Sequence, residues 1–304
     1  MINKSIKGII AAPFTPMNEV GEINPGIIFD YAHKLKKDGL TGVFVCGTTG
    51  EGMSMTLEER KEIAEEWVKY QENDFKVIVH VGTTSFKQSQ ELARHAQKIG
   101  AYGTSIMGPI FLKPTNIEPL VDFCASVACA APNIPFFYYH IPIISGIELS
   151  MKDYLEIAQK KIPNLAGIKY THDNLVEMQH CNNVDGGKWT IFNGFDENLF
   201  KVLNIGVEAA VGSTYNYMNP IYLSLIKDFK LGNSEAALKK QQKCNDIIAS
   251  LFENGGPMIA GKAIMKWVGV DCGPCRLPLT NLSDKSLSNL RDVLEAKDFF
   301  GLNQ

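Results

Sequence analysis

A single lysine at the end of a short apolar run has a setting that suits covalent chemistry. Residues 165–168 are apolar and are followed by Lys169, Tyr170 and Thr171. A run this short, bounded upstream by Pro163 and Asn164, is typical of a buried strand. A lysine at the end of such a strand loses hydration, which disfavours the charged ammonium and leaves an amine that can attack a carbonyl. A lysine that extends to the surface gives the same local pattern, so the assignment depends on its neighbours.

Hydroxyl groups follow two other strand-like runs. Run 42–46 is followed by Gly47-Thr48-Thr49-Gly50-Glu51. The hydroxyls and backbone N–H groups of Thr48 and Thr49 can hold a carboxylate, although a plain strand-to-helix turn has the same composition. Run 135–139 ends in Tyr139, whose phenol can pass a proton within a closed site. A core tyrosine bonded to backbone is the alternative.

Acidic and small polar residues follow two further runs. Gly194, Asp196 and Glu197 come after run 189–192, and Ser213 comes after run 207–211. Adjacent carboxylates above a sheet can accept hydrogen bonds from several hydroxyls of a polyol. The alternative is an N-cap aspartate with a first-turn glutamate, and both roles can hold at once. Together, the amine, the phenol, the threonines and the carboxylates indicate a Schiff-base enzyme.

The elements that would position these residues alternate along the chain. Strand-like runs occur at 8–12, 42–46, 77–81, 104–107, 135–139, 165–169, 189–192 and 207–211. Helical patterns follow at 24–37, 56–71, 89–98, 117–131, 151–160, 175–181 and 197–205. Eight apolar strands covered by helices predict an α/β fold, the (β/α)8 TIM barrel, with its active site at the C-terminal ends of the strands. An open doubly wound sheet is the alternative, but no Gly-x-Gly-x-x-Gly follows the first strand.

The pattern changes towards the C-terminus. From Pro220 onward only helical periodicity remains, in three segments at 221–231, 234–253 and 283–296. We therefore expect two parts: residues 1–219 form the barrel that carries the active site, and residues 220–304 form a C-terminal helical extension.

Composition limits the classes of partner and compartment. The 304 residues carry a net charge of −3 with a pI near 6.1, which gives no electrostatic reason to expect nucleic acid or an anionic membrane as partner. No apolar stretch approaches the length of a membrane span, and the first seven residues lack the apolar core of a signal peptide. The seven scattered cysteines suit reduced thiols. These features predict a cytoplasmic protein.

Three motifs, in this order and at these separations, carry a family resemblance. They are Gly47-Thr48-Thr49-Gly50-Glu51, Tyr139-His140-Ile141-Pro142 and Gly167-Ile168-Lys169. They resemble the pyruvate-dependent class I aldolases that include dihydrodipicolinate synthase and N-acetylneuraminate lyase, and the resemblance runs from Ile6 to about Pro278. Within that superfamily, segments 194–197 and 212–216 are similar to the sugar-binding loops of the N-acetylneuraminate lyase branch. The arginine that the synthases usually carry after Tyr-x-x-Pro is missing from segment 143–146.

The resemblance implies a role for each candidate residue. Lys169 would form an imine with C2 of an open-chain 2-keto acid, and Tyr139 would transfer the proton of the C4 hydroxyl. Thr48 and Thr49 would hold the pyruvyl carboxylate. The hydroxylated tail of the substrate would contact Thr171, Gly194, Asp196, Glu197 and Ser213. The implied reaction is the reversible cleavage of sialic acid (N-acetylneuraminate) to pyruvate and N-acetylmannosamine, with no metal or organic cofactor because the imine with Lys169 is the electron sink.

The resemblance also leaves questions open. Many members of the family carry a tyrosine after the fourth strand that reaches a neighbouring subunit, whereas this chain has Phe111 in that segment. The family is commonly tetrameric, which implies a homotetramer. Two other functions remain: another pyruvate-dependent aldolase, such as a dihydrodipicolinate synthase or a 2-keto-3-deoxy sugar acid aldolase, and a barrel that binds a keto acid without turnover.

Two further patterns are not assigned to the site. Cys272-Gly-Pro-Cys275 looks like a redox or zinc motif but lacks two further ligands and a thioredoxin-like βαβ context. The histidines show no metal-ligand spacing with the carboxylates along the sequence, so no metal site is predicted.

Overall fold

Eight parallel strands close into one barrel in chain order, with β1 hydrogen-bonded to β8. The structure is a computed structural model that describes residues 6–303. Residues 1–5, which contain most of the segment considered for a signal peptide, lie outside the described residues, as does residue 304. The strands are β1 Gly8–Ala11, β2 Gly42–Val45, β3 Lys76–His80, β4 Gly103–Met107, β5 Phe136–His140, β6 Leu165–Tyr170, β7 Thr190–Asn193 and β8 Ala209–Gly212. The closed barrel confirms the predicted TIM barrel.

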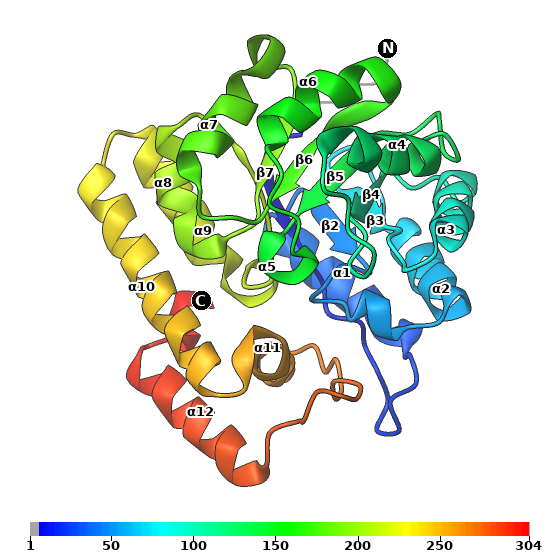
Figure 1. Ribbon diagram of the computed structural model, residues 1–304. Coiled ribbons are helices and arrows are strands. Elements are labelled where there is room, and N and C mark those ends of the chain that lie inside the picture. The colour runs from blue at the N-terminus through cyan, green and yellow to red at the C-terminus, as the bar shows by residue number, and fades with distance from the viewer. Residues whose placement is uncertain (1–5, 304) are drawn as a thin grey trace.

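Helices follow the strands and surround the barrel (Figure 1). They are α1 Ile28–Lys37, α2 Leu57–Val68, α3 Phe86–Lys98, α4 Ile117–Ala128, α5 Pro142–Ser145, α6 Met151–Lys161, α7 Leu175–Asn183, α8 Leu199–Asn204 and α9 Tyr215–Lys230. The predicted start of α2 is confirmed: Thr56 Oγ1 accepts from Glu59 N, and Glu59 Oε2 accepts from Thr56 N, which is a complete capping box.

Helix α9 begins at Tyr215, earlier than the segment 221–231 that the periodicity predicted. Pro220 therefore lies inside the helix. A proline inside a helix has no N–H to donate, so the carbonyl of Asn216, four residues earlier, loses its helical partner. Lys34 Nζ donates to that carbonyl oxygen at 3.3 Å instead. Asn216 also binds the barrel, because its Nδ2 donates to Ala12 O at 2.8 Å and to Ser213 O at 2.7 Å. A contact from α1 therefore replaces the hydrogen bond that Pro220 cannot make.

Three further helices, α10 Ser234–Glu253, α11 Gly256–Trp267 and α12 Asp284–Ala296, stand together at one side of the barrel (Figure 1). Helix α10 packs along α9. The helical periodicity predicted α10 and α12 but not α11, whose first residues are glycine and proline. Proline suits the first turn of a helix, where no N–H partner is needed, so these residues begin a helix here instead of a loop.

The predicted boundary between the barrel and the C-terminal extension, near residue 220, falls inside α9, because residues 215–230 form one helix. The division of the chain into these two parts stays a prediction.

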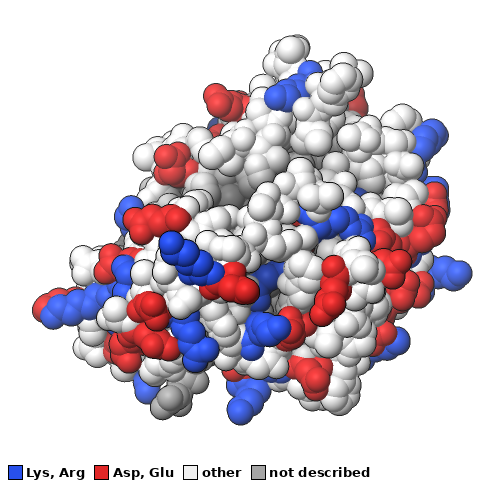
Figure 2. Space-filling view, turned by 90° about the horizontal axis from the view of Figure 1, so that it is seen from below, with Lys and Arg blue, Asp and Glu red and all other residues white. Residues whose placement is uncertain are grey.

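The outer surface carries both signs of charge. On the face drawn in Figure 2, Lys and Arg side chains lie interspersed with Asp and Glu side chains. None of the helices in residues 6–303 combines the length and the apolar character that a membrane crossing demands.

The barrel interior is filled by alternate residues of the strands. Phe44, Ile78, Phe137, Tyr139 and Phe192 belong to one buried apolar cluster inside the barrel. Their neighbours in sequence, such as Val43, Val79 and Tyr138, belong to the layer between strands and helices. This is the period of two that a strand imposes on its side chains.

The period shifts by one residue at the start of β6. Phe136 pairs with Leu165, but the next residue, Phe137, pairs with Gly167, so Ala166 is an extra residue in β6. Such a bulge moves every later side chain to the other face of the strand. Tyr139 therefore pairs with Lys169 and both point into the barrel. Gly167 suits this position because a Cβ atom there would lie 1.8 Å from Thr190 O.

Gly167→Ala is expected to destabilise the fold, because the added methyl group overlaps the backbone of β7. We expect a loss of about 2 kcal/mol or more in the free energy of unfolding, measured by denaturant unfolding. Gly26→Ala is the control, since its Cβ would meet only Asn24 Oδ1, at an ordinary contact distance of 3.7 Å. Equal stabilities of the two variants would contradict the assigned packing of β6 against β7.

Candidate functional site

Lys169 and Tyr139 lie side by side inside the barrel, at the C-terminal ends of β6 and β5. They are 5% and 3% exposed. The Nζ atom of Lys169 lies 4.1 Å from the centroid of the Tyr139 ring and 4.5 Å from that of Phe44. The Tyr139 hydroxyl lies 3.4 Å from Thr48 Oγ1, on the loop after β2. The structure thus brings together the amine, the phenol and one predicted threonine.

Lys169 differs from the other buried lysine. Among residues 6–303 two lysines are buried, Lys169 and Lys262. Lys262 forms a buried ion pair with Glu51 at 2.8 Å and donates to Pro274 O at 2.6 Å. No carboxylate of the described residues forms an ion pair with Lys169, whose nitrogen faces two aromatic rings. An amine in this setting is available to react with a carbonyl carbon.

The loop that carries Thr48 and Thr49 is fixed at its far end. Both threonines are half-buried. Glu51, at the end of the loop, has the left-handed φ of 55°. Its Oε2 accepts from Arg276 N at 2.7 Å, and its Oε1 forms an ion pair with Lys262 Nζ at 2.8 Å. These partners belong to α11 and to the segment after it, so the C-terminal extension holds the loop in place.

Asp196, which follows β7, is buried and hydrogen-bonded to the segment after the neighbouring strand β8. Its Oδ2 accepts from Thr214 N at 2.9 Å and from Thr214 Oγ1 at 2.6 Å. Its Oδ1 has no hydrogen-bond partner among the described residues and lies where a Cβ of Gly212 would be. Asp196 does not cap the next helix, because Phe195 occupies that position without a side-chain bond. Burial and the charge of Glu197 raise the pKa of Asp196 to about 7, against the bonds from Thr214.

The other residues predicted for the substrate tail follow three neighbouring strands, β6, β7 and β8. Thr171 follows β6, is buried and has an Oγ1 without a hydrogen-bond partner in residues 6–303. Gly194 follows β7, and a Cβ there would lie 1.9 Å from Thr171 Oγ1, so only glycine fits. Glu197 and Ser213 are half-buried. The arrangement offers unpaired hydroxyl and carboxylate oxygens near the lysine, as a polyhydroxylated ligand requires.

Sequence reasoning missed His80 as a member of this site. It is buried in β3, and its ring lies 5.9 Å from that of Tyr139 and 6.0 Å from that of Phe44. Burial and the charges of Arg60 and Lys169 lower the pKa of His80 well below its usual range. The signal was present in the sequence, because His80 is two residues after Ile78 and therefore shares its inward face.

Cys272 and Cys275 are both buried next to the Glu51–Lys262 pair. Burial raises the pKa of Cys272 to about 12 and that of Cys275 to about 11, so both are neutral thiols near pH 7. Neither thiol has the lowered pKa of a reactive cysteine.

Comparisons with known proteins place the whole chain among aldolases. Residues 5–297 match the model of the Dihydrodipicolinate synthetase family. The chain is 38% identical to the N-acetylneuraminate lyase of Rattus norvegicus over 302 residues, which cover 97% of this chain and 94% of the relative. It is similar to the sialic acid aldolase structure from Aliivibrio salmonicida, with a TM-score of 0.94, 40% identity and coverage of 97% and 98% of the two chains. A Ruminococcus gnavus sialic acid aldolase described as a catalytic lysine mutant gives a TM-score of 0.92 at 30% identity, over 98% of each chain.

The raised pKa of Asp196 predicts how stability depends on pH. In the unfolded chain this carboxyl loses its proton near pH 3.8, whereas in the folded protein it does so near pH 7. The folded state therefore binds more protons between these values, and the free energy of unfolding falls as the pH rises from about 4 to about 7. The contribution is on the order of 4 kcal/mol.

Asp196→Asn removes this titration while keeping the shape of the side chain. Urea unfolding of both proteins at several values between pH 4 and 7.5 measures the effect. The stability of the variant should fall less over this range than that of the wild type. Parallel curves would show that Asp196 is already ionised at the acidic end.

Proposed function

The chain belongs to the dihydrodipicolinate synthetase family, and we propose that it is a Schiff-base aldolase that reversibly cleaves N-acetylneuraminate to pyruvate and N-acetylmannosamine. The observation that carries the proposal is the setting of Lys169: a buried amine without an ion-pair partner among the described residues, facing two aromatic rings, beside Tyr139. The similarity to N-acetylneuraminate lyases over nearly the whole chain supports the choice of substrate.

Lys169 starts the reaction. Its amine attacks C2 of the open-chain sugar acid, and loss of water gives a protonated imine. The positive charge of the imine nitrogen then lies against the faces of the Phe44 and Tyr139 rings, which attract cations. Thr48 and Thr49 hold the neighbouring carboxylate through hydroxyl and backbone N–H groups.

Tyr139 acts on the bond that breaks. As the C3–C4 bonding electrons move into the imine, which becomes an enamine, the C4 hydroxyl gives its proton to the Tyr139 oxygen, and Tyr139 passes its own proton to the substrate carboxylate. The C4 carbon leaves as the aldehyde of N-acetylmannosamine. Protonation of the enamine at C3 and hydrolysis of the imine release pyruvate and restore Lys169. Thr48, 3.4 Å from the Tyr139 hydroxyl, links the group that moves the proton to the loop that holds the carboxylate.

The remaining residues hold the hydroxylated tail. The unpaired Oδ1 of Asp196 accepts a hydrogen bond from a substrate hydroxyl, and the unpaired Oγ1 of Thr171 donates or accepts one. Glu197 and Ser213, both half-buried, contact the more distant part, and Gly194 leaves the space that Thr171 occupies.

One observation favours a second candidate, an aldolase whose substrate carries a second carboxylate. The synthases place an arginine near the turn that α5 forms here, and segment 143–146 has no cation of its own. The structure adds Lys113, whose Nζ lies where a Cβ of Gly146 would be. A cation beside α5 suits an additional carboxylate, and a substrate panel separates the two aldolases.

The proposal extends to cofactor, compartment and assembly. The protonated imine is itself the electron sink, so the reaction needs no metal or organic cofactor. Seven free cysteines, six of them buried, suit a reducing cytoplasm. The exposed apolar side chains of Phe111, Leu112 and Ile143 suit contact between subunits of a homotetramer.

Lys169→Ala should abolish turnover, because the amine that forms the imine is lost. The measurement is borohydride trapping with N-acetylneuraminate, followed by mass analysis of the peptide that contains residue 169. Wild-type protein should carry a reduced pyruvyl group, since the bond has broken before reduction, and Lys160→Ala, a change at an exposed lysine on α6, should behave like wild type.

The other outcomes of trapping are equally informative. Trapping with pyruvate but not with the sugar acid would keep the aldolase and reject sialic acid as the substrate. Trapping with neither compound would favour the barrel that binds a keto acid without turnover.

Tyr139→Phe should lower kcat for cleavage by about 100-fold or more, because it removes the group that transfers the proton. The phenylalanine keeps the ring that faces Lys169, so borohydride trapping of pyruvate should continue. Tyr70→Phe, in the turn after α2 and outside the barrel, is the control. An unchanged kcat would remove Tyr139 from the mechanism.

A further inference from the structure

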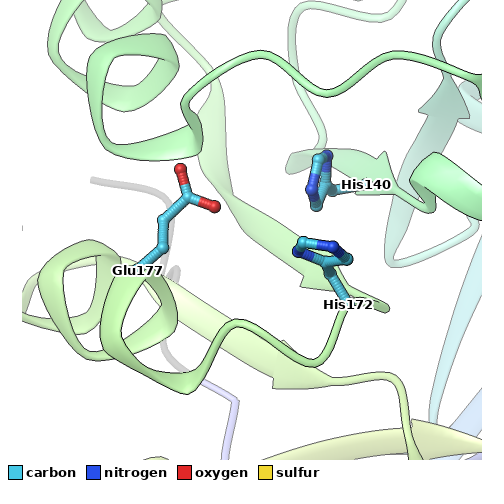
Figure 3. A group of neighbouring side chains, drawn as sticks. All are labelled: His140, His172 and Glu177. Atoms are coloured by element: carbon cyan, nitrogen blue, oxygen red, sulfur yellow. The ribbon is translucent and has the colours of Figure 1, made fainter.

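Two histidines and a glutamate meet on the outer side of the barrel, where β5 and β6 end. His140 is the last residue of β5, His172 follows β6, and Glu177 lies on α7, and the three side chains converge (Figure 3). One ligand atom of each residue lies within 4.8 Å of those of the other two. We propose that His140, His172 and Glu177 bind a divalent transition-metal ion such as Zn²⁺.

His140 is the buried ligand of this cluster. Its side chain is 2% exposed, and its Nδ1 has no hydrogen-bond partner among the described residues. A buried polar nitrogen without a partner costs free energy, and a metal ion is one partner that an imidazole nitrogen accepts. The ring is held by the ring of Tyr170, whose centroid lies 5.0 Å away.

Glu177 is held in place by two donors. Met151 N donates to its Oε1 at 2.8 Å, and the Tyr170 hydroxyl donates to its Oε2 at 2.6 Å. Each carboxylate oxygen has two lone pairs, so each keeps one for an ion. Hydrogen bonds of this kind orient the ligands of metal sites.

His172 is the ligand that can move. It lies on the segment after β6, its side chain is 37% exposed, and its ring is nearly perpendicular to that of His140 at 5.8 Å between centroids. Tetrahedral zinc with bonds of about 2.0–2.1 Å needs ligand atoms roughly 3.3 Å apart. The ligand atoms now lie within 4.8 Å of one another, so binding of an ion requires the His172 side chain to turn inward, and its exposure gives the ion a path from solvent.

The donor set selects the class of ion. Two imidazoles and one carboxylate suit zinc and the neighbouring transition metals, whereas calcium and magnesium prefer a set made of oxygen atoms. Three protein ligands leave a fourth position for water.

The site lies on the opposite side of the strands from Lys169. His140 directly follows Tyr139, and His172 directly follows Thr171, but the alternation of side chains points them away from the barrel interior. A bound ion would connect the ends of β5 and β6 from outside. Metal binding is measured without substrate, so this inference and the proposed function stand or fail separately.

Isothermal titration of chelator-treated protein with zinc chloride tests the proposal. We expect one ion per chain and a rise in the unfolding temperature when zinc is present. His172→Ala should weaken binding by at least tenfold, and Tyr170→Phe, which keeps the ring but loses the bond to Glu177, by about tenfold. His180→Ala, at an exposed position on α7, the helix that carries Glu177, should bind zinc like wild type.

Two results would overturn the proposal. One is a wild-type protein that binds no zinc. The other is binding that survives in His172→Ala but is lost in Cys129→Ser, because Cys129 is an exposed thiol able to bind zinc by itself. The unfolding temperature of each metal-free variant, compared with wild type, separates loss of the site from loss of the fold.

Discussion

The positions of the reactive groups depend on which residues of each strand point into the barrel interior. Without the extra residue in β6, the period of two that places Ala166 inside would also place Ile168 and Tyr170 inside and would turn Lys169 towards the helices. The bulge reverses this order. It depends on the close approach of Gly167 to β7, which leaves no room for a Cβ. The position of the amine is therefore a property of backbone register before it is one of side-chain contacts.

The two buried lysines, Lys262 and Lys169, differ in their partners and therefore in whether their amines are free to react. Lys262 shares its charge with Glu51 and a backbone carbonyl, so breaking that pair would leave a buried charge uncompensated. This pair anchors the loop of Thr48 and Thr49 to the C-terminal extension. Lys169 has aromatic faces around its nitrogen and no ion pair within residues 6–303, so its amine is not committed to a carboxylate. The extension fixes the binding loop, while the barrel leaves the lysine free to react.

The sequence predicted those features that depend on strand ends. The proximity of Lys169, Tyr139 and Thr48 could be predicted because the C-terminal ends of parallel strands in a barrel meet on one face. His80 was missed because its inward direction depends on alternation along β3. The two open roles of Asp196 could not be separated from sequence, since its partner Thr214 follows the next strand, β8, and the bond forms only when the barrel closes. Helix α11 was missed because its starting glycine and proline also suit a loop.

The cluster of His140, His172 and Glu177 could not be predicted from the spacing of residues along the sequence. It also connects the outer side of the strands to the barrel interior. His140 and His172 are 32 positions apart, and no ligand motif joins them along the chain. They meet because β5 and β6 are neighbours. Thr171 N donates to His140 O at 2.8 Å, so one backbone hydrogen bond connects the segment that carries Tyr139 and His140 to the segment that carries Thr171 and His172. A ligand that holds His140 and His172 together would also hold this hydrogen bond. It would thereby fix the separation of Tyr139 from Thr171 inside the barrel.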